Sequence, residues 1–145
     1  MKKLLVLSVF LLITSCGGKS GIELQGAIDL EDYRCRAKFT LTNHTSKPLD
    51  EFKAIIKVND DDEIYFKLWT YESGSGYKAI KSKEKYTLRQ PWIEGENGEG
   101  RKNCDKLKKL SELTYKVKSI KKCKQDGIYE DECKKSVFIT STKKK

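Results

Sequence analysis

The chain has 145 residues, with 30 lysines and arginines against 21 aspartates and glutamates, which gives a formal net charge of +9. Charged residues make up 35% of the chain and only 2 residues are proline, a composition that excludes a disordered tail and a bundle of membrane helices. The basic excess lies in residues 101–145, which hold 15 basic and 6 acidic side chains. This part of the chain predicts a solvated basic surface, or one that attracts an acidic protein or anionic head groups.

The first fifteen residues have the three parts of an export signal. Lys2 and Lys3 form a charged start, residues 4–13 form an apolar stretch too short to span a bilayer, and two small residues precede Cys16. The segment "ITSC" resembles the lipobox of bacterial lipoproteins, in which the signal is cleaved before a cysteine that carries lipid. The resemblance implies that residues 1–15 are a signal peptide and that Cys16 is the lipidated first residue of the mature chain.

The mature chain is expected to be anchored to a membrane through the lipid on Cys16. Residues 16–21 predict a flexible tether, residues 22–142 a single folded domain, and residues 143–145 a basic tail. Gly17 stands where, by resemblance to enteric lipoproteins, an aspartate favours retention in the inner membrane. We therefore expect a cell-envelope lipoprotein of the outer membrane that faces the periplasm or the cell surface.

Short strands are predicted along most of the domain. In "YRCRAKFTLTN", Tyr33, Cys35, Ala37, Phe39 and Leu41 share one face, and this period of two is typical of a half-buried strand. The next strand buries Phe52, Ala54, Ile56 and Val58. The other strands are expected at residues 22–28, 64–71, 83–93, 113–120 and 136–141. About seven short strands joined by turn-rich links predict an all-β fold, an antiparallel Ig-like β-sandwich.

One segment departs from the alternation. In "NCDKLKKLSEL", Leu107, Leu110 and Leu113 recur at intervals of three residues. This spacing predicts one short helix that crosses between the sheets, with Asn103 as its N-cap.

The run "KFTLTNHTSKPLDEFKAIIKVNDDDEIYF" is similar to the core of small Ig-like, FxLYD-type domains of bacterial lipoproteins. The later run "LTYKVKSIKKCKQDGIY" resembles their late strand and the turn that follows it, so the similarity covers residues 33–130. The chain lacks a clear FxLYD motif and has additional cysteines. Such domains share no catalytic residues, so the resemblance implies a fold and no chemistry.

Four cysteines remain once Cys16 carries lipid: Cys35, Cys104, Cys123 and Cys133. An even number in an oxidising compartment predicts two disulfides, for which three pairings exist. We favour Cys123 with Cys133, which flank a turn-like segment, and Cys35 with Cys104. A zinc site is the alternative, but the chain has no CxxC pair and a single histidine, so we expect no metal and no cofactor.

Neither His44 nor the acidic segment "NDDDE" at residues 59–63 indicates catalysis. No arrangement of serine and aspartate around His44 suggests a triad. The acidic segment concentrates carboxylates that calcium favours, but it lacks the ligand alternation and glycine of an EF-hand, so a solvated hairpin tip is expected. Nucleic-acid binding is not expected, because the chain carries an export signal and no recognised nucleic-acid motif.

Four aromatic residues are the candidate interaction residues: Trp69, Tyr71, Tyr77 and Trp92. Both faces of "IYFKLWTY" carry large rings, which predicts that one face is exposed, whereas the alternative places Trp69 in the core. We expect a non-enzymatic protein that binds an acidic or envelope protein. The alternative is an inhibitor or an immunity or exclusion lipoprotein that blocks a toxin, a hydrolase or a phage receptor, and a hydrolase of envelope polymers is less favoured. The sequence leaves the oligomeric state open.

Overall fold

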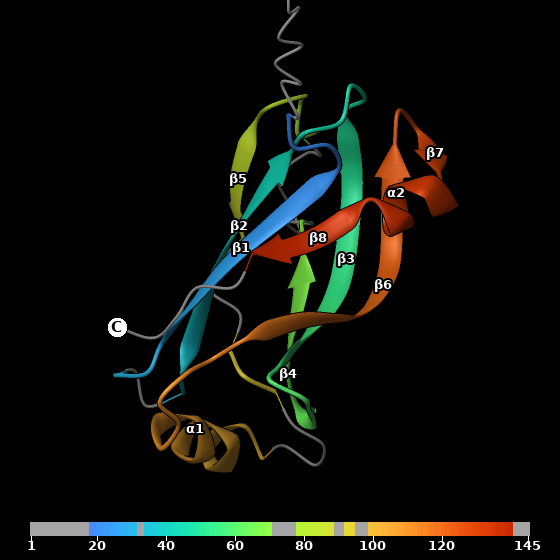
Figure 1. Ribbon diagram of the computed structural model, residues 1–145. Coiled ribbons are helices and arrows are strands. Elements are labelled where there is room, and N and C mark those ends of the chain that lie inside the picture. The colour runs from blue at the N-terminus through green and yellow to red at the C-terminus, as the bar shows by residue number, and fades with distance from the viewer. Residues whose placement is uncertain (1–17, 32–33, 71–77, 89–91, 95–98, 141–145) are drawn as a thin grey trace, which may run out of the picture.

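Two four-stranded β-sheets pack face to face, which confirms the prediction of a mainly β, sandwich-like fold (Figure 1). The computed structural model describes residues 18–31, 34–70, 78–88, 92–94 and 99–140. One sheet has the strand order β5-β2-β1-β8 and the other β4-β3-β6-β7. The strands are β1 (Ile22–Asp29), β2 (Arg36–Asn43), β3 (Leu49–Val58), β4 (Asp61–Trp69), β5 (Lys85–Leu88), β6 (Tyr115–Gln125), β7 (Ile128–Tyr129) and β8 (Val137–Thr140).

The core forms between the two sheets because alternate side chains of each strand point inward. Phe52, Ala54, Ile56 and Val58 of β3 are all fully buried, as their spacing predicts. In the same way, Cys35, Ala37, Phe39 and Leu41 are buried before and along β2. The ring of Phe39 lies 5.9 Å from that of Phe66 on the facing sheet and 5.6 Å from that of Tyr115. These three rings join the two sheets.

The strand arrangement departs from the prediction at β8. The described residues form eight strands in place of about seven, and β8 runs parallel to β1, with Ile22 opposite Val137, so the sandwich is not wholly antiparallel. A second short helix, α2 (Asp131–Lys135), precedes β8. This helix carries the chain from the second sheet back to the first, where the open side of β1 is left for β8. Such a long-range pairing has no signature in the local pattern of the sequence.

The predicted helix is present as α1 (Gly100–Lys108), but Asn103 is not its N-cap. Glu99 occupies that position, and Asn103 lies inside the helix with its side chain buried. The Asn103 side-chain amide donates to the carbonyls of Glu63 (3.4 Å) and Glu94 (3.5 Å). Asn103 is therefore a tertiary contact that joins α1 to the second sheet.

Two disulfides link Cys35 with Cys104 and Cys123 with Cys133, the pairing that the sequence favours. The first ties the start of β2 to α1, and the second ties β6 to α2. Two disulfides suggest an extracytoplasmic protein, because such bonds persist in oxidising compartments. Among the residues that the structure describes, no helix is both long and apolar enough to cross a membrane.

We expect the two disulfides to contribute different amounts to the free energy of unfolding. The Cys35–Cys104 bond closes a loop of 69 residues and the Cys123–Cys133 bond one of 10. Cross-linking lowers the entropy of the unfolded chain more for the longer loop, so we expect C35A/C104A to cost about 4 kcal/mol and C123A/C133A about 3 kcal/mol. Urea unfolding of both double variants measures the two values. A larger loss for C123A/C133A would contradict this order.

Candidate interaction surface

The outer face of the second sheet carries alternating lysines and aromatic rings. On β4, Tyr65, Lys67 and Trp69 alternate with the buried residues Ile64, Phe66 and Leu68, so the first three point away from the core. The pairing of Lys53 on β3 with both Trp69 and Lys122 extends this face to β6. We call it the lysine–aromatic face. It consists of Lys53, Tyr65, Lys67, Trp69, Lys118, Lys122, Lys124 and Tyr129.

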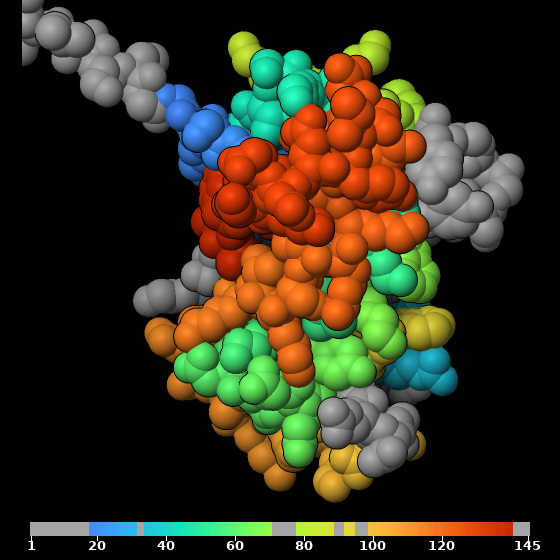
Figure 2. Space-filling model, turned by 90° about the vertical axis from the view of Figure 1, so that its right-hand side faces the viewer, coloured from blue at the N-terminus to red at the C-terminus, as the bar shows by residue number. Residues whose placement is uncertain are grey.

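Strand β6 supplies lysines along the middle of this face. Figure 2 shows the β6 segment at the centre, with the β3 and β4 segments below it and the α2–β8 segment beside it. The register between β3 and β6 shifts between Lys53 and Ala54 and again between Ile55 and Ile56. Such shifts insert extra residues into one strand and turn additional side chains outward. The bulges of β6 therefore raise the number of lysines that the strand exposes.

Each ring on this face lies close to an ammonium group. The Lys53 Nζ is 5.3 Å from the centroid of the Trp69 ring. The Nζ atoms of Lys67 and Lys118 lie 5.8 and 5.7 Å from the Tyr65 centroid, on β4. Lys124 lies 5.7 Å from the ring of Tyr129. Cation–π contacts of this kind contribute about 0.5–1 kcal/mol at exposed sites, and they hold rings and charges in place together.

Carboxylates accompany some of these lysines, but not all of them. Glu51 accepts from Lys122 (2.8 Å) and from the Tyr129 hydroxyl (2.6 Å). Burial raises the pKa of Glu51, but these hydrogen bonds more than offset it and hold the pKa below its usual range. Lys67 pairs with Glu94, whose hydrogen bond raises the lysine pKa. Within the described residues Lys53 and Lys124 form no ion pair, although the charge of Lys124 also helps to lower the pKa of Glu51.

The structure separates the aromatic residues that the sequence groups as candidates. Trp69 is 53% exposed on the lysine–aromatic face, so the alternative that places it in the core is wrong. Trp92 is 49% exposed but lies beside Arg34 and Arg36, next to β2 of the other sheet. Tyr71 and Tyr77 lie outside the described residues. Trp69 and Trp92 therefore do not form one patch.

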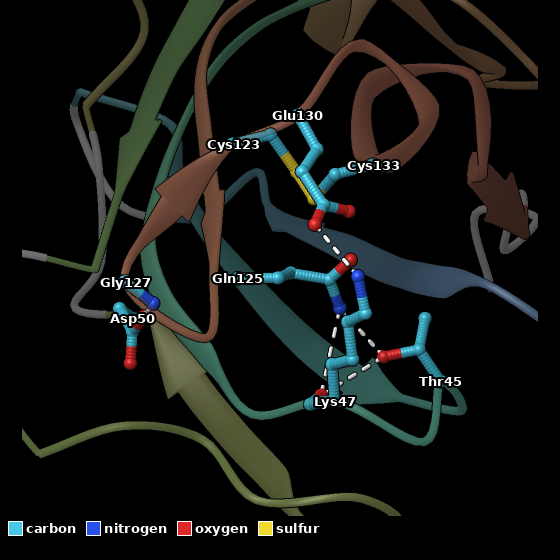
Figure 3. A network of polar contacts seen from close by, with 8 residues as sticks. All are labelled: Thr45, Lys47, Asp50, Cys123, Gln125, Gly127, Glu130 and Cys133. Atoms are coloured by element: carbon cyan, nitrogen blue, oxygen red, sulfur yellow. Dashed lines mark hydrogen bonds and ion pairs between the residues drawn. A yellow bond between two sulfur atoms is a disulfide. The ribbon is translucent and has the colours of Figure 1, made fainter.

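Polar contacts fix the turn after β2 (Figure 3). The buried side chain of Gln125 donates to the Thr45 hydroxyl at 2.6 Å, and Lys47 pairs with Glu130 at 2.6 Å. The Gly127 N–H donates to Asp50 at 2.6 Å. These bonds connect the turn to the β6–β7 hairpin, next to the Cys123–Cys133 bond. The residues of the "NHTSKP" segment thus have structural roles.

His44 and the acidic segment also have structural partners. His44 Nε2 lies 2.8 Å from the Glu23 carboxylate, whose other oxygen accepts from Lys19 (2.6 Å) and Thr140 (2.8 Å). In the acidic segment β4 already begins at Asp61, so the hairpin tip is shorter than predicted. Its carboxylates pair with lysines: Asp60 with Lys116, Asp62 with Lys57 and Lys118, and Glu63 with Lys106. No group of three or more potential metal ligands occurs in the described part of the chain.

The sequence prediction identified Trp69 but not the lysines around it on β3 and β4. Lys53 and Lys67 lie outside the basic segment 101–145, so the charge distribution does not indicate them. For Lys67, the alternation of Tyr65, Lys67 and Trp69 is the signal in the sequence that it shares a face with aromatic rings. Comparisons with protein families, with characterised proteins and with solved structures find no match to this chain. The surface is therefore interpreted from its own chemistry.

The environment of Glu23 predicts a pH dependence of stability. Hydrogen bonds from Lys19 and then His44 lower its pKa from 4.5 to about 2 against the opposing effect of burial. A lowered carboxyl pKa stabilises the fold above pH 4.5, and this contribution is lost as the pH falls from 4.5 towards 2. Because Lys19 is largely exposed and screened, we expect Glu23→Gln to cost about 1–2 kcal/mol at pH 7.

Urea unfolding between pH 2 and 7 measures this contribution. Glu23→Gln should lose less stability on acidification than the parent chain. Glu31→Gln changes an exposed carboxylate just after β1 and should lose as much stability as the parent. Equal pH profiles for the parent and Glu23→Gln would contradict the assignment.

Proposed function

We propose that the protein is a lipid-anchored lipoprotein of the bacterial cell envelope with a non-enzymatic binding role. The lipobox that ends at Cys16 supports the anchor, and the two disulfides agree with an extracytoplasmic site. The absence of aspartate after Cys16 supports the outer membrane as its location, facing the periplasm or the cell surface. In this proposal, residues 1–15 are removed and residues 16–21 join the lipid to the sandwich.

We further propose that the sandwich is Ig-like, as the resemblance to FxLYD-type domains implies. The order β5-β2-β1 matches strands E, B and A of the Ig fold, and β4-β3-β6-β7 matches C′, C, F and G. In this interpretation β8 is an addition beside strand A. Under this assignment the lysine–aromatic face is the outer surface of the sheet that contains strands C and F.

The observation that carries the binding role is the lysine–aromatic face itself. Exposed aromatic rings are enriched where proteins bind one another, and Trp69 combines large apolar area with a neighbouring positive charge. Lysines outnumber carboxylates on this face, so an acidic protein surface is the complementary partner. An inhibitor or immunity lipoprotein is one form of this role, and the charge of the face favours an acidic target for it.

Substitutions on the lysine–aromatic face should weaken the capture of a partner. Processed protein, with residue 16 first, is immobilised and exposed to envelope extract. We expect W69A/K53E/K124E to retain a specific partner at least roughly tenfold less well than the parent, because ring and charges are both lost. The matched control W92A/K108E/K109E alters a tryptophan and two lysines elsewhere and should retain it.

Salt provides an independent check on the same material. Since exposed charges are screened at ~8 Å in 0.15 M salt and at ~3 Å in 1 M salt, retention by the parent should fall as salt rises. A partner that both triple variants retain equally would contradict the proposed face.

The anchor is tested separately in cells. Cys16→Ala should leave an uncleaved precursor that incorporates no labelled fatty acid, because the thiol that receives the lipid is gone. Ser15→Ala keeps a small residue before the cysteine and should be processed and labelled normally. Processing and labelling of Cys16→Ala at the normal level would refute the lipobox assignment.

A further inference from the structure

One end of the sandwich receives the tether. The Gly21 carbonyl accepts a hydrogen bond from the His44 N–H (2.8 Å), and the Ile22 N–H donates to the Ser136 carbonyl (3.1 Å). Two residues earlier, the Lys19 ammonium group is 2.6 Å from Glu23. Residues 19–21, together with the turns at 44–48, 80–85 and 126–130, are called the tether end. Figure 1 places these turns at one end of the molecule and α1 at the other.

The short tether limits how far this end can lie from the lipid. Three peptide units separate Cys16 from Lys19, and five separate it from Gly21. An extended chain spans at most ~3.5 Å per residue, so residues 19–21 lie within roughly 10–18 Å of Cys16. The head-group layer is roughly 5–7 Å thick on each side of a bilayer, and charges act over ~8 Å in physiological salt. An acylated Cys16 therefore allows residues 19–21 to approach the lipid head groups, within the distance over which their charges act.

A group of lysines lies beside the tether at this end. Lys78, Lys81, Lys83 and Lys85 occur within eight positions that contain one acidic residue, Glu84. We call residues 78–85 the lysine turn. All four lysines are exposed, and Glu84 pairs with Lys78 at 3.4 Å. Among the described residues, Lys81, Lys83 and Lys85 form no ion pair through their side chains, so the turn carries excess positive charge.

Backbone hydrogen bonds fix the lysine turn relative to the tether. The Lys83 N–H donates to the Asn43 carbonyl (2.6 Å), and the next residue, His44, binds Gly21. Because β5, β2 and β1 are consecutive in the sheet and neighbouring strands are ~4.8 Å apart, the turn lies roughly 10 Å from the tether. The lysine turn and the tether therefore lie at the same end of the sandwich.

We infer that the lysine turn binds the anionic phospholipid head groups of the membrane that holds the anchor. The inference rests on the proposed acylation of Cys16, and it identifies which part of the sandwich faces the membrane. Each lysine near an anionic bilayer strengthens binding by roughly fivefold. Helix α1 also carries lysines, but it lies at the end away from the tether. Lys134 and Lys135 of α2 lie closer to the tether, but they pair with Asp131 and Glu132.

The test uses the processed chain that begins at Cys16, which retains every strand, both disulfides and the whole described core. With the other four cysteines in disulfides, the Cys16 thiol is alkylated with a single fourteen-carbon maleimide. One chain of this length binds bilayers only marginally and reversibly, at ~10⁴ M⁻¹, so the contribution of the lysines is measurable. Partition into vesicles of phosphatidylcholine with and without ~30% phosphatidylglycerol is compared, at an anionic content that gives a substantial surface potential.

We expect the alkylated chain to bind the anionic vesicles at least roughly tenfold more tightly than the neutral ones. K81E/K83E should remove most of this preference, whereas the matched control K108E/K109E, at the α1 end, should keep it within about twofold because the tether holds α1 away from the bilayer. Circular dichroism and urea midpoints verify that both variants fold. Equal binding to the two kinds of vesicle, or equal losses in the two variants, would overturn the inference.

Because the acyl chain is attached chemically, this result does not depend on whether cells acylate Cys16. A failure here with normal labelling of Cys16 in cells leaves the anchor in place and removes only the docking site. If the alkylated chain binds anionic vesicles as expected but cells do not label Cys16, the head-group site is supported and the proposed lipid anchor is refuted.

Discussion

The buried side-chain amide of Asn43 holds together the end of the sandwich on which the functional proposals depend. Its nitrogen donates to the carbonyls of Lys47 (2.8 Å) and Ile80 (2.9 Å), and its oxygen accepts from the Thr45 N–H (3.0 Å) and hydroxyl (2.7 Å). The hydrogen-bonding capacity of the amide is thus filled, and a buried amide without partners costs about 1–3 kcal/mol. Through these bonds a single residue fixes the turn after β2 and the lysine turn relative to each other.

The same requirement for one buried face per strand shapes the second sheet. Ile64, Phe66 and Leu68 must point into the core, so Tyr65, Lys67 and Trp69 must point to solvent. The bulges in β6 add lysines to that outer surface without disturbing the buried residues of the strand. A one-residue slip of β4 would bury Lys67, which the core cannot accept without cost. Core packing and the proposed binding face are therefore consequences of one register.

Most of the fold could be predicted because its signals are local. The alternation from Cys35 to Leu41 and from Phe52 to Val58 depends only on the period of a strand. In the sequence Asn103 resembles a cap because it precedes the periodic leucines, whereas its buried amide binds the carbonyl of Glu63, 40 positions away. The parallel pairing of β1 with β8 was missed for the same reason.

The candidate surfaces were predicted less well than the fold. Lys81 and Lys83 lie in a part of the chain whose summed charge is negative, and their importance depends on Gly21, which only the folded chain brings near them. Trp69 and Trp92 look equivalent in the sequence, although Trp69 lies on β4 and Trp92 lies outside the strands, beside β2 of the other sheet. Neither the summed charge of a segment nor the set of aromatic residues in the sequence indicates which residues share a surface in the folded chain.

The central proposal is that the tether end of the sandwich faces the membrane and that α1 lies on the side away from it. Paramagnetic relaxation measured on the acylated protein, in nanodiscs that contain an anionic lipid with a paramagnetic head group, tests this directly. We expect the strongest relaxation at the backbone amides of residues 44–47 and 81–84 and the weakest at residues 104–108 of α1. Uniform relaxation along the chain, or the strongest effect in α1, would contradict it.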